Sequence, residues 1–134
     1  PSFVERRIHN FNYLKEALKG TEDKLILPKA CENSRPSWFG FLITCREGVD
    51  RNQIVQMIEA KGVQTRMLFA GNLTKHPCFD QMRATGKGYR IAGTLENTDR
   101  IMKDTFWIGV YPGMTDEMLE AMANAIKDAV NGVK

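Results

Sequence analysis

The sequence predicts a small α+β domain in which helices flank a three-stranded, largely antiparallel sheet. Three apolar segments rich in aromatic and β-branched residues, 38–45, 64–69 and 105–110, have the length and composition of strands. Segments with helical spacing of apolar residues lie before, between and after them. Because a long irregular connection at 70–93 breaks the alternation of helix and strand, an antiparallel layer fits better than a parallel sheet.

The first apolar stripe predicts a helix over residues 3–19. Its members recur at helical spacing: Val4, Ile8, Phe11, Leu14 and Leu18. Gly20 favours an end to the helix at that point. A helix of this length is marginal in water by itself, so it must pack on another element. The polar segment that follows, 21–36, contains two prolines and is expected to be a connector with a short extended piece at 24–27.

The first predicted strand, 38–45, is apolar with almost no polar alternation. This pattern is typical of a strand buried on both faces. Gly40 lies inside the strand, where a missing side chain often marks the close approach of another group.

The second predicted helix runs over 50–61. Asp50 followed three residues later by Gln53 resembles a capping box, and Ile54, Met57 and Ile58 form its inner face. Gly62 follows, where a glycine commonly ends a helix.

Two further helices complete the pattern. Asn97 is predicted to cap a short helix that ends at Lys103. Thr115 is predicted to cap the last helix, 116–130, whose first turn carries acidic residues that favour a helix N-terminus. We expect this helix and the helix over 50–61 to cover one face of the sheet.

Composition excludes several classes of protein. The chain is 43% hydrophobic and 26% charged, which is ordinary for a globular domain, and its length of 134 residues fits one domain. A net charge of +3 without a basic patch gives no reason to expect a nucleic-acid partner. An uninterrupted run of about 18 apolar residues is missing, so no membrane span is expected, and the cytoplasm is the default compartment.

Neither a metal site nor a set of catalytic residues is predicted. Cys31, Cys45 and Cys78 are odd in number and their spacing matches no metal-binding pattern, so we expect reduced, structural thiols. The two histidines, His9 and His76, are far apart in the sequence, and no triad or paired carboxylates can be assembled around them.

The most polar strand end lies in the stretch 62–77. Arg66 sits in a segment that is otherwise apolar, and a cluster of hydrogen-bonding side chains, beginning with Asn72, follows it. A buried or half-buried arginine needs a partner, either a ligand carboxylate or phosphate or an acid of this chain, and the residues favour neither alternative. Arg100, judged by composition, is expected to be solvated.

Three stretches, SWFGFLIT at 37–44, GVQTRMLFAGNLTKHPCF at 62–79 and NTDRIMKDTFWIGVYPGMTDEML at 97–119, together resemble the DegT/DnrJ/EryC/StrS family of vitamin B6-dependent sugar enzymes. Within the family, the second and third stretches resemble the nucleotide-sugar 3-dehydrase branch of the CDP-4-keto-6-deoxyglucose type. The resemblance covers nearly the whole chain.

The resemblance implies that residues 1–134 are the single C-terminal small domain of a longer enzyme with the type I aminotransferase fold, with helix 1–20 linking to an absent large domain. Full-length members use PLP or, in this branch, PMP, act on nucleotide sugars in deoxysugar and lipopolysaccharide O-antigen biosynthesis, and form homo-oligomers. The CDP-sugar enzymes also carry an iron–sulfur cluster on cysteines of the large domain. The cluster ligands are absent here, and we expect neither bound cofactor nor catalysis from this chain alone.

Matching positions of the family motifs makes six residues candidates to face the substrate or cofactor: Trp38, Phe39, Arg66, Phe69, Asn72 and Arg100. The segment 81–88 departs from the pattern because it looks longer than the corresponding loop. An exposed apolar surface is expected around helix 3–19 and the Trp38 end, where the large domain would pack. Two alternatives remain open: a free-standing small domain with a binding or regulatory role, and part of a lysine-type sugar aminotransferase.

Overall fold

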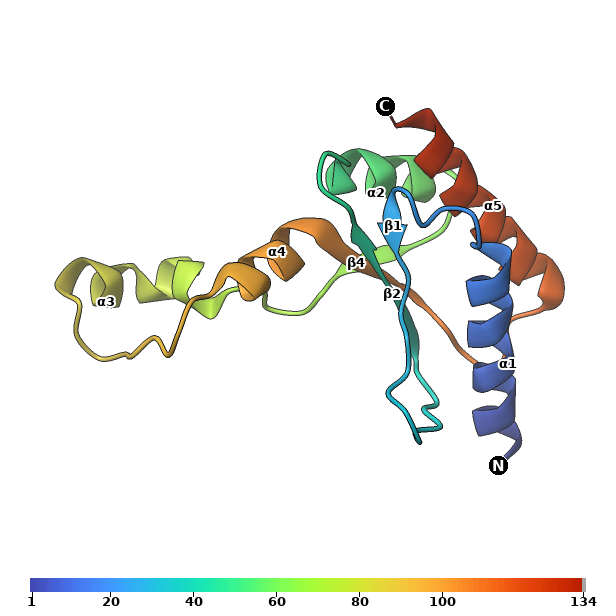
Figure 1. Ribbon diagram of the computed structural model, residues 1–134, viewed down its shortest axis with the longest axis horizontal. Coiled ribbons are helices and arrows are strands. Elements are labelled where there is room, and N and C mark those ends of the chain that lie inside the picture. Colours follow the sequence, from blue (N-terminus) through green and yellow to red (C-terminus); the bar gives the residue numbers. More distant parts are fainter. Residues whose placement is uncertain (134) are drawn as a thin grey trace.

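The computed structural model describes residues 1–133, which form an α+β domain built on one four-stranded sheet (Figure 1). The strands lie in the order β1-β2-β4-β3, and every neighbouring pair is antiparallel. Along the chain the elements are α1 (Ser2–Ala17), β1 (Leu25–Ile26), β2 (Gly40–Cys45), α2 (Arg51–Ala60), β3 (Thr65–Met67), the 3₁₀ turns η1 (Leu73–Lys75) and η2 (Pro77–Phe79), α3 (Asp80–Thr85), α4 (Glu96–Asp104), β4 (Thr105–Gly109) and α5 (Asp116–Gly132).

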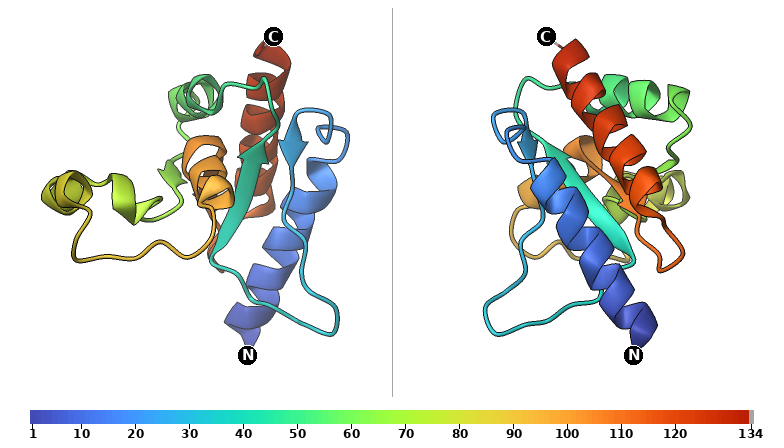
Figure 2. Two further views of the ribbon diagram at one scale, coloured as in Figure 1. Left: turned by 60° about the vertical axis from the view of Figure 1, so that its left-hand side comes forward. Right: turned by 90° about the vertical axis from the view of Figure 1, so that its right-hand side faces the viewer.

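Helices α1, α2 and α5 form a layer on one face of the sheet (Figure 2). Alternate residues of the two central strands point into this layer, namely Phe41 and Ile43 from β2 and Phe106 and Ile108 from β4, and all four are fully buried. The predicted cover by the second and last helices is confirmed, and α1 joins them through the stripe expected for it. Burial of such side chains is the main favourable term in folding the body.

Within residues 1–133 no helix layer covers the opposite face of the sheet, so the expected burial of the first strand on both faces was wrong. Leu42, Trp107 and Arg66 form one row across this open face, because Leu42 and Arg66 both pair with Trp107 in the sheet register. Leu42 stays 38% exposed and Arg66 is exposed. Apolar residues on both faces of β2 misled the sequence analysis because pattern alone does not reveal whether a covering layer is present.

The sheet has four strands rather than the three predicted. Leu25 and Ile26, within the extended piece expected at 24–27, pair with Cys45 and Thr44 and add a strand at the edge. Two residues are too few to show a period, which explains the omission. The central strands are also shorter than predicted, and β3 covers only Thr65–Met67.

Two helix caps were predicted correctly and one was wrong. The Asp50 side chain accepts from the backbone N–H of Asn52 and Gln53, and the Thr115 side chain accepts from that of Met118. Helix α4, however, begins at Glu96 after Leu95, so Asn97 is already inside the helix and does not cap it.

Residues 68–104, which we call the arm, extend away from the body of the domain (Figure 1). The expected irregular connection at 70–93 in fact holds η1, η2 and α3. Asn72 is the one buried residue in the arm, and every residue from 81 to 94 is exposed. The arm therefore consists of short helical segments without an apolar core of their own.

Gly40 lies under the indole of Trp107 on the open face. A Cβ atom built on Gly40 would stand 2.6 Å from Trp107 Cε3, closer than any side chain tolerates. The prediction that Gly40 marks a close approach is confirmed. On its partner across the strands, Gly109, an added Cβ atom would meet nothing within 4 Å.

We predict that Gly40→Ala lowers the free energy of unfolding by about 1–3 kcal/mol, the usual effect of overpacking, because the indole must leave its seat. Urea unfolding monitored by circular dichroism measures the difference. Gly109→Ala is the matched control, since it adds the same methyl group to the cross-strand partner in open space. Equal stability of the two variants would contradict the close contact.

Candidate functional site

The open face of the sheet ends in a shallow cavity of about 240 Å³, which we call the aromatic hollow. Its lining comes from the start of β2, the segment after β3 and the middle of β4: Trp38, Phe39, Gly40, Leu42, Leu68, Phe69 and Trp107. Three of the six candidate residues, Trp38, Phe39 and Phe69, thus meet here. The lining carries no charged side chain, so the hollow suits an apolar or planar group.

Trp107 is the centre of this hollow. Its ring makes an edge-on contact with Phe39 at 5.4 Å between centroids and lies 6.3 Å from Phe69. Its Nε1 donates a hydrogen bond of 3.2 Å to the Met67 carbonyl oxygen, which fixes the indole against β3. Sequence analysis missed Trp107, although strict alternation along 105–110 places it opposite to Phe106 and Ile108.

A second cavity, of about 460 Å³, continues the aromatic hollow along the same face toward β1. The two share Trp38, Gly40 and Leu42, and the second extends to Ile26 and Thr44. Trp38 connects both cavities to the helix layer, because its ring packs 4.5 Å from that of Phe11 in α1. The two cavities therefore form one mainly apolar trough, with Lys29 and Thr44 at its β1 end.

Arg66 projects from the open face beside Trp107, outside the lining of the aromatic hollow. It is exposed, not buried or half-buried as expected, and within residues 1–133 it forms no ion pair or side-chain hydrogen bond. Of the two alternatives that the sequence left open, an ion pair with an acid of this chain is not present in the described residues. An exposed guanidinium beside an aromatic surface can bind a carboxylate or phosphate.

Asn72 has a structural task at the base of the arm. Its side chain is 2% exposed, donates 2.7 Å to Asp99 Oδ1, and accepts from the Thr74 N–H at 3.0 Å and from Thr74 Oγ1 at 2.6 Å. The hydrogen bond from Asn72, followed by the one from Lys75 at 2.9 Å, lowers the pKa of Asp99 from its ordinary value. This cluster joins the outgoing and returning segments of the arm.

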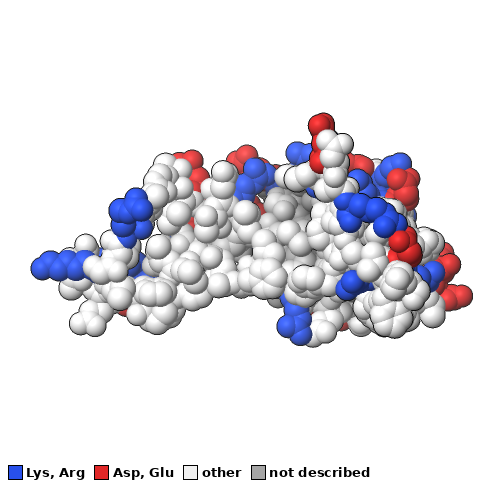
Figure 3. Space-filling model, turned by 90° about the horizontal axis from the view of Figure 1, so that it is seen from below, with Lys and Arg blue, Asp and Glu red and all other residues white. Residues whose placement is uncertain are grey.

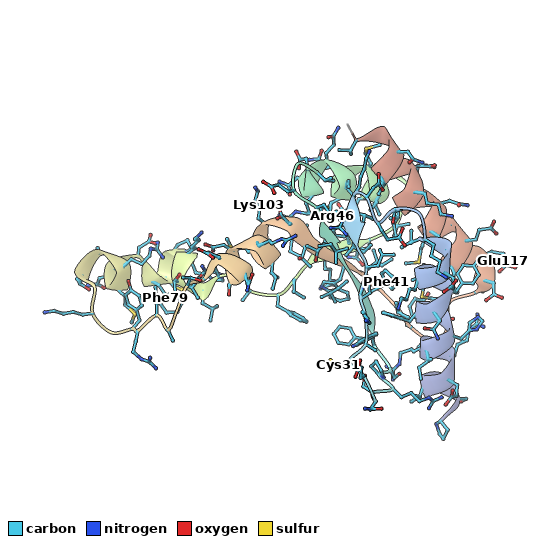
Figure 4. The ribbon with its side chains drawn as sticks, viewed as in Figure 1. Cys31, Phe41, Arg46, Phe79, Lys103 and Glu117 are labelled. Carbon is cyan, nitrogen blue, oxygen red and sulfur yellow. The ribbon has the colours of Figure 1, made fainter. Side chains whose placement is uncertain are left out.

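Arg100 is separate from the aromatic hollow. It lines a cavity of about 650 Å³ between α4 and the loop after β2, to which α4 also contributes Lys103 and the loop contributes Arg46. Figure 4 labels Arg46 and Lys103. Asp50, Asp99 and Asp104 line the same cavity, so its charges are mixed and favour no particular ion. The structure thus does not bring Arg100 or Asn72 into the aromatic hollow, and their predicted role toward substrate stays a prediction.

The three cysteines lie apart and differ in environment. Cys45 is buried in the core, where burial raises the pKa of its thiol to about 11, while Cys31 and Cys78 are exposed. Among residues 1–133 no cluster of three or more histidine, cysteine, aspartate or glutamate side chains could hold a metal ion. No helix in this part of the chain has the length and apolarity needed to cross a bilayer.

Comparison with known proteins identifies similar sequences among sugar enzymes. The model of the DegT/DnrJ/EryC1/StrS aminotransferase family matches residues 1–127. The chain is 47% identical, over 94% of its own length, to the lipopolysaccharide biosynthesis protein RfbH of Salmonella typhimurium. It is 43% identical, over 96% of its length, to the dTDP-4-dehydro-2,6-dideoxy-D-glucose 3-dehydratase of Saccharopolyspora spinosa. The chain spans only 28% and 27% of these two relatives.

Solved structures of longer enzymes contain the same fold. GDP-4-keto-6-deoxy-D-mannose-3-dehydratase from E. coli, solved with bound hydrated PLP, superposes with a TM-score of 0.77 at 21% identity, covering 94% of this chain and 31% of that one. DesV of S. venezuelae, solved with a ketimine intermediate, gives 0.80 at 16% identity, covering 99% of this chain and 33% of that one. At this level of identity the likeness establishes the fold.

We predict that Asn72→Ala raises the pKa of Asp99 toward its ordinary value, because the largest cause of its lowering is the hydrogen bond from Asn72. A carboxylate with a lowered pKa in the folded state stabilises that state above its ordinary pKa and loses this contribution as the pH falls through the lowered value. Carbon NMR titration of the Asp99 carboxyl group measures the shift. The carboxyl of Glu5, whose pKa is lowered by Arg35, is the internal control and should titrate unchanged. An unaltered Asp99 titration would contradict the assignment.

Proposed function

Because the chain belongs to the DegT/DnrJ/EryC1/StrS aminotransferase family, we propose that it is the C-terminal small domain of a pyridoxamine-phosphate-dependent nucleotide-sugar 3-dehydratase. The observation that carries the proposal is identity of 47% and 43% with RfbH and a dTDP-sugar 3-dehydratase over nearly the whole chain. A third relative, GDP-4-keto-6-deoxy-D-mannose 3-dehydratase of Escherichia coli O55:H7, is 27% identical over 81% of the chain. Two of these three relatives are named for 3-dehydration of a nucleotide sugar.

The parent enzyme, in this proposal, acts in deoxysugar and lipopolysaccharide O-antigen biosynthesis in the cytoplasm and forms homo-oligomers. RfbH, 47% identical, is named for lipopolysaccharide biosynthesis, and the CDP-4-keto-6-deoxyglucose type of substrate follows from the motif resemblance at 62–79 and 97–119. The other two relatives are named for dTDP- and GDP-linked sugars.

The chain by itself offers an incomplete site. The lining of the aromatic hollow supplies apolar rings and no acid, base or charged donor. Arg66 lies beside Trp107 and forms no ion pair within residues 1–133. These groups do not fit a phosphate-bearing cofactor without further donors, so we derive no chemical step for this chain. Its contribution is to cover a planar or apolar part of a ligand, exclude water and place one guanidinium near an anionic group.

The fold alone does not distinguish a 3-dehydratase from the alternative, a lysine-type sugar aminotransferase. TlmJ from Streptoalloteichus hindustanus, an aminotransferase, superposes with a TM-score of 0.79 at 17% identity, as well as the dehydratase does. Sequence similarity favours the dehydratase. A free-standing small domain would be favoured only if the gene encoded no more than these 134 residues.

We predict that the purified 134-residue chain neither dehydrates a CDP-4-keto-6-deoxy sugar nor binds pyridoxamine phosphate stoichiometrically. The physical reason is that proton transfer and cofactor binding need groups that the open face does not present. Equilibrium dialysis with pyridoxamine phosphate and a coupled assay of the keto-sugar test both statements, with the full-length enzyme as the positive control. Turnover by the 134-residue chain would refute the proposal that it supplies only part of the site.

Within the full-length enzyme, Arg66→Gln is expected to lower kcat/KM by about 10- to 100-fold, the usual value of a hydrogen bond to a charged group. Lys19→Gln, which removes one positive charge from an exposed position outside the arm and the open face, is the matched control and should stay within about twofold. Circular dichroism of both variants verifies folding. Equal losses in the two variants would remove Arg66 from the site.

A further inference from the structure

We propose that the arm, residues 68–104, docks on the rest of the parent polypeptide and acquires its stable fold only through that contact. The inference rests on the proposed function in one respect, namely that the chain is part of a longer enzyme. It goes beyond that function by identifying the arm, and not α1, as the main docking element, and by assigning a coupled folding step to it.

The arm cannot be stable through its own interactions. Helix α3 has six residues and α4 has nine, and neither buries a single residue. Isolated helices shorter than about 12–15 residues are marginal in water even with favourable sequences. Ordering each residue also costs about 1–2 kcal/mol of backbone entropy, which an unburied segment cannot offset.

Apolar side chains on the arm are nevertheless numerous. Six of its large hydrophobic residues are between 38% and 74% exposed: Phe69, Leu73, Met82, Tyr89, Ile91 and Ile101. The underside of the molecule accordingly shows a broad area without charged groups between the arm and the body (Figure 3). A broad exposed area without charges that carries several large apolar side chains is typical of an interaction site.

This surface is continuous with the aromatic hollow. Phe69, at the start of the arm, belongs to the hollow and contacts Trp107 of the sheet. One partner can therefore cover the arm and the open face together. The expectation of an exposed apolar surface is confirmed at the Trp38 end, where Phe39 is 58% exposed. Along α1, Phe11 and Leu14 are buried in the core of this chain and only Phe3, at its start, is largely exposed.

Contacts at the base of the arm fix the direction in which the arm leaves the body. Asn72 joins the outgoing segment to Asp99 of the returning segment at 2.7 Å. Gly71 packs so closely on Met102 that a Cβ atom on the glycine would lie 2.6 Å from Met102 Cγ. The segment beyond this clamp has no such contacts with the body, so it is presented to a partner and not folded back.

Two observations identify the partner. The chain spans only 28% of RfbH, so the larger part of a parent of that length lies outside the structure and is available to cover the arm. The arm segment 81–95 carries no acidic residue, and two of its basic residues, Lys87 and Arg90, form no ion pair within residues 1–133, whereas Arg83 pairs with Asp80. The covering surface should therefore be apolar with an acidic rim, and we assign it to the same polypeptide chain.

Hydrogen–deuterium exchange measured by mass spectrometry on the 134-residue chain and on the full-length parent tests the proposal. In the short chain, amides of 76–95 should exchange at least tenfold faster than those of β2 and β4. In the parent, the same amides should slow by tenfold or more. Equal protection of the arm in both proteins, or equally fast exchange in both, would overturn the proposal.

The natural cysteines give a second measurement. Cys78, in the arm, and Cys31, in the connector before β2, are both exposed, whereas Cys45 is buried (Figure 4 labels Cys31). Maleimide labelling of Cys78, followed by peptide mapping, should be at least tenfold slower in the parent than in the short chain, and Cys45 should stay unreactive in both. Undiminished labelling of Cys78 in the parent would count against docking.

A variant pair separates docking from folding. Ile91→Ser should restore fast exchange to the arm of the parent by about tenfold, while Met118→Ser, at a similarly exposed residue of α5, should not. Cross-linking in a mixture of isotopically light and heavy parent chains should join the arm to the large part of the same chain. Links only between light and heavy chains would overturn the assignment to the same polypeptide. Dehydratase activity without arm protection would refute this inference alone, whereas arm protection without such activity would refute the proposed function alone.

Discussion

The arrangement of side chains on the open face depends on one contact, the packing of the Trp107 indole against the backbone of Gly40. The ring can pack against Gly40 only because no Cβ atom occupies that position. In this place it contacts Phe39 and Phe69 and bonds to the Met67 carbonyl oxygen, so one side chain ties together both ends of the aromatic hollow and the edge strand β3. The helix layer on the other face carries the stability of the domain, which leaves this face free to hold apolar groups that contribute little within the chain.

Sequence reasoning was most successful where periodicity and caps are local properties. The inward stripes of the helices, the caps at Asp50 and Thr115 and the antiparallel central strands follow from spacing and residue type, and the structure confirms them. Strand β1 and helix α3 were not predicted because their two and six residues are too few to show a periodic pattern. The predicted burial of β2 on both faces was wrong. An apolar strand has the same sequence pattern whether or not a second layer covers its other face.

The candidate site divides in a way that sequence could not show. Three residues at motif positions, Trp38, Phe39 and Phe69, meet around one cavity. Two others lie elsewhere: Asn72 at the base of the arm and Arg100 in the cavity between α4 and the loop after β2. Position in a motif does not tell whether a polar side chain faces a ligand or holds a loop. That distinction comes from its hydrogen bonds: Asn72 uses both ends of its amide within the chain, and Arg66 uses none of its donors within residues 1–133.

Stability is consequently unequal along this chain. The body has a continuous core that joins α1, α2, α5 and the sheet, and local opening of these elements requires exposure of many apolar side chains. The arm has only its basal clamp and short helices, so its opening exposes almost nothing that is not already exposed. Rearranging such an element costs little free energy, so the arm can change conformation on contact with a ligand or a neighbouring surface while the sheet keeps its structure. In the parent enzyme that we propose, an apolar face with such an arm beside it would cover a site whose chemical groups are supplied by the rest of the polypeptide.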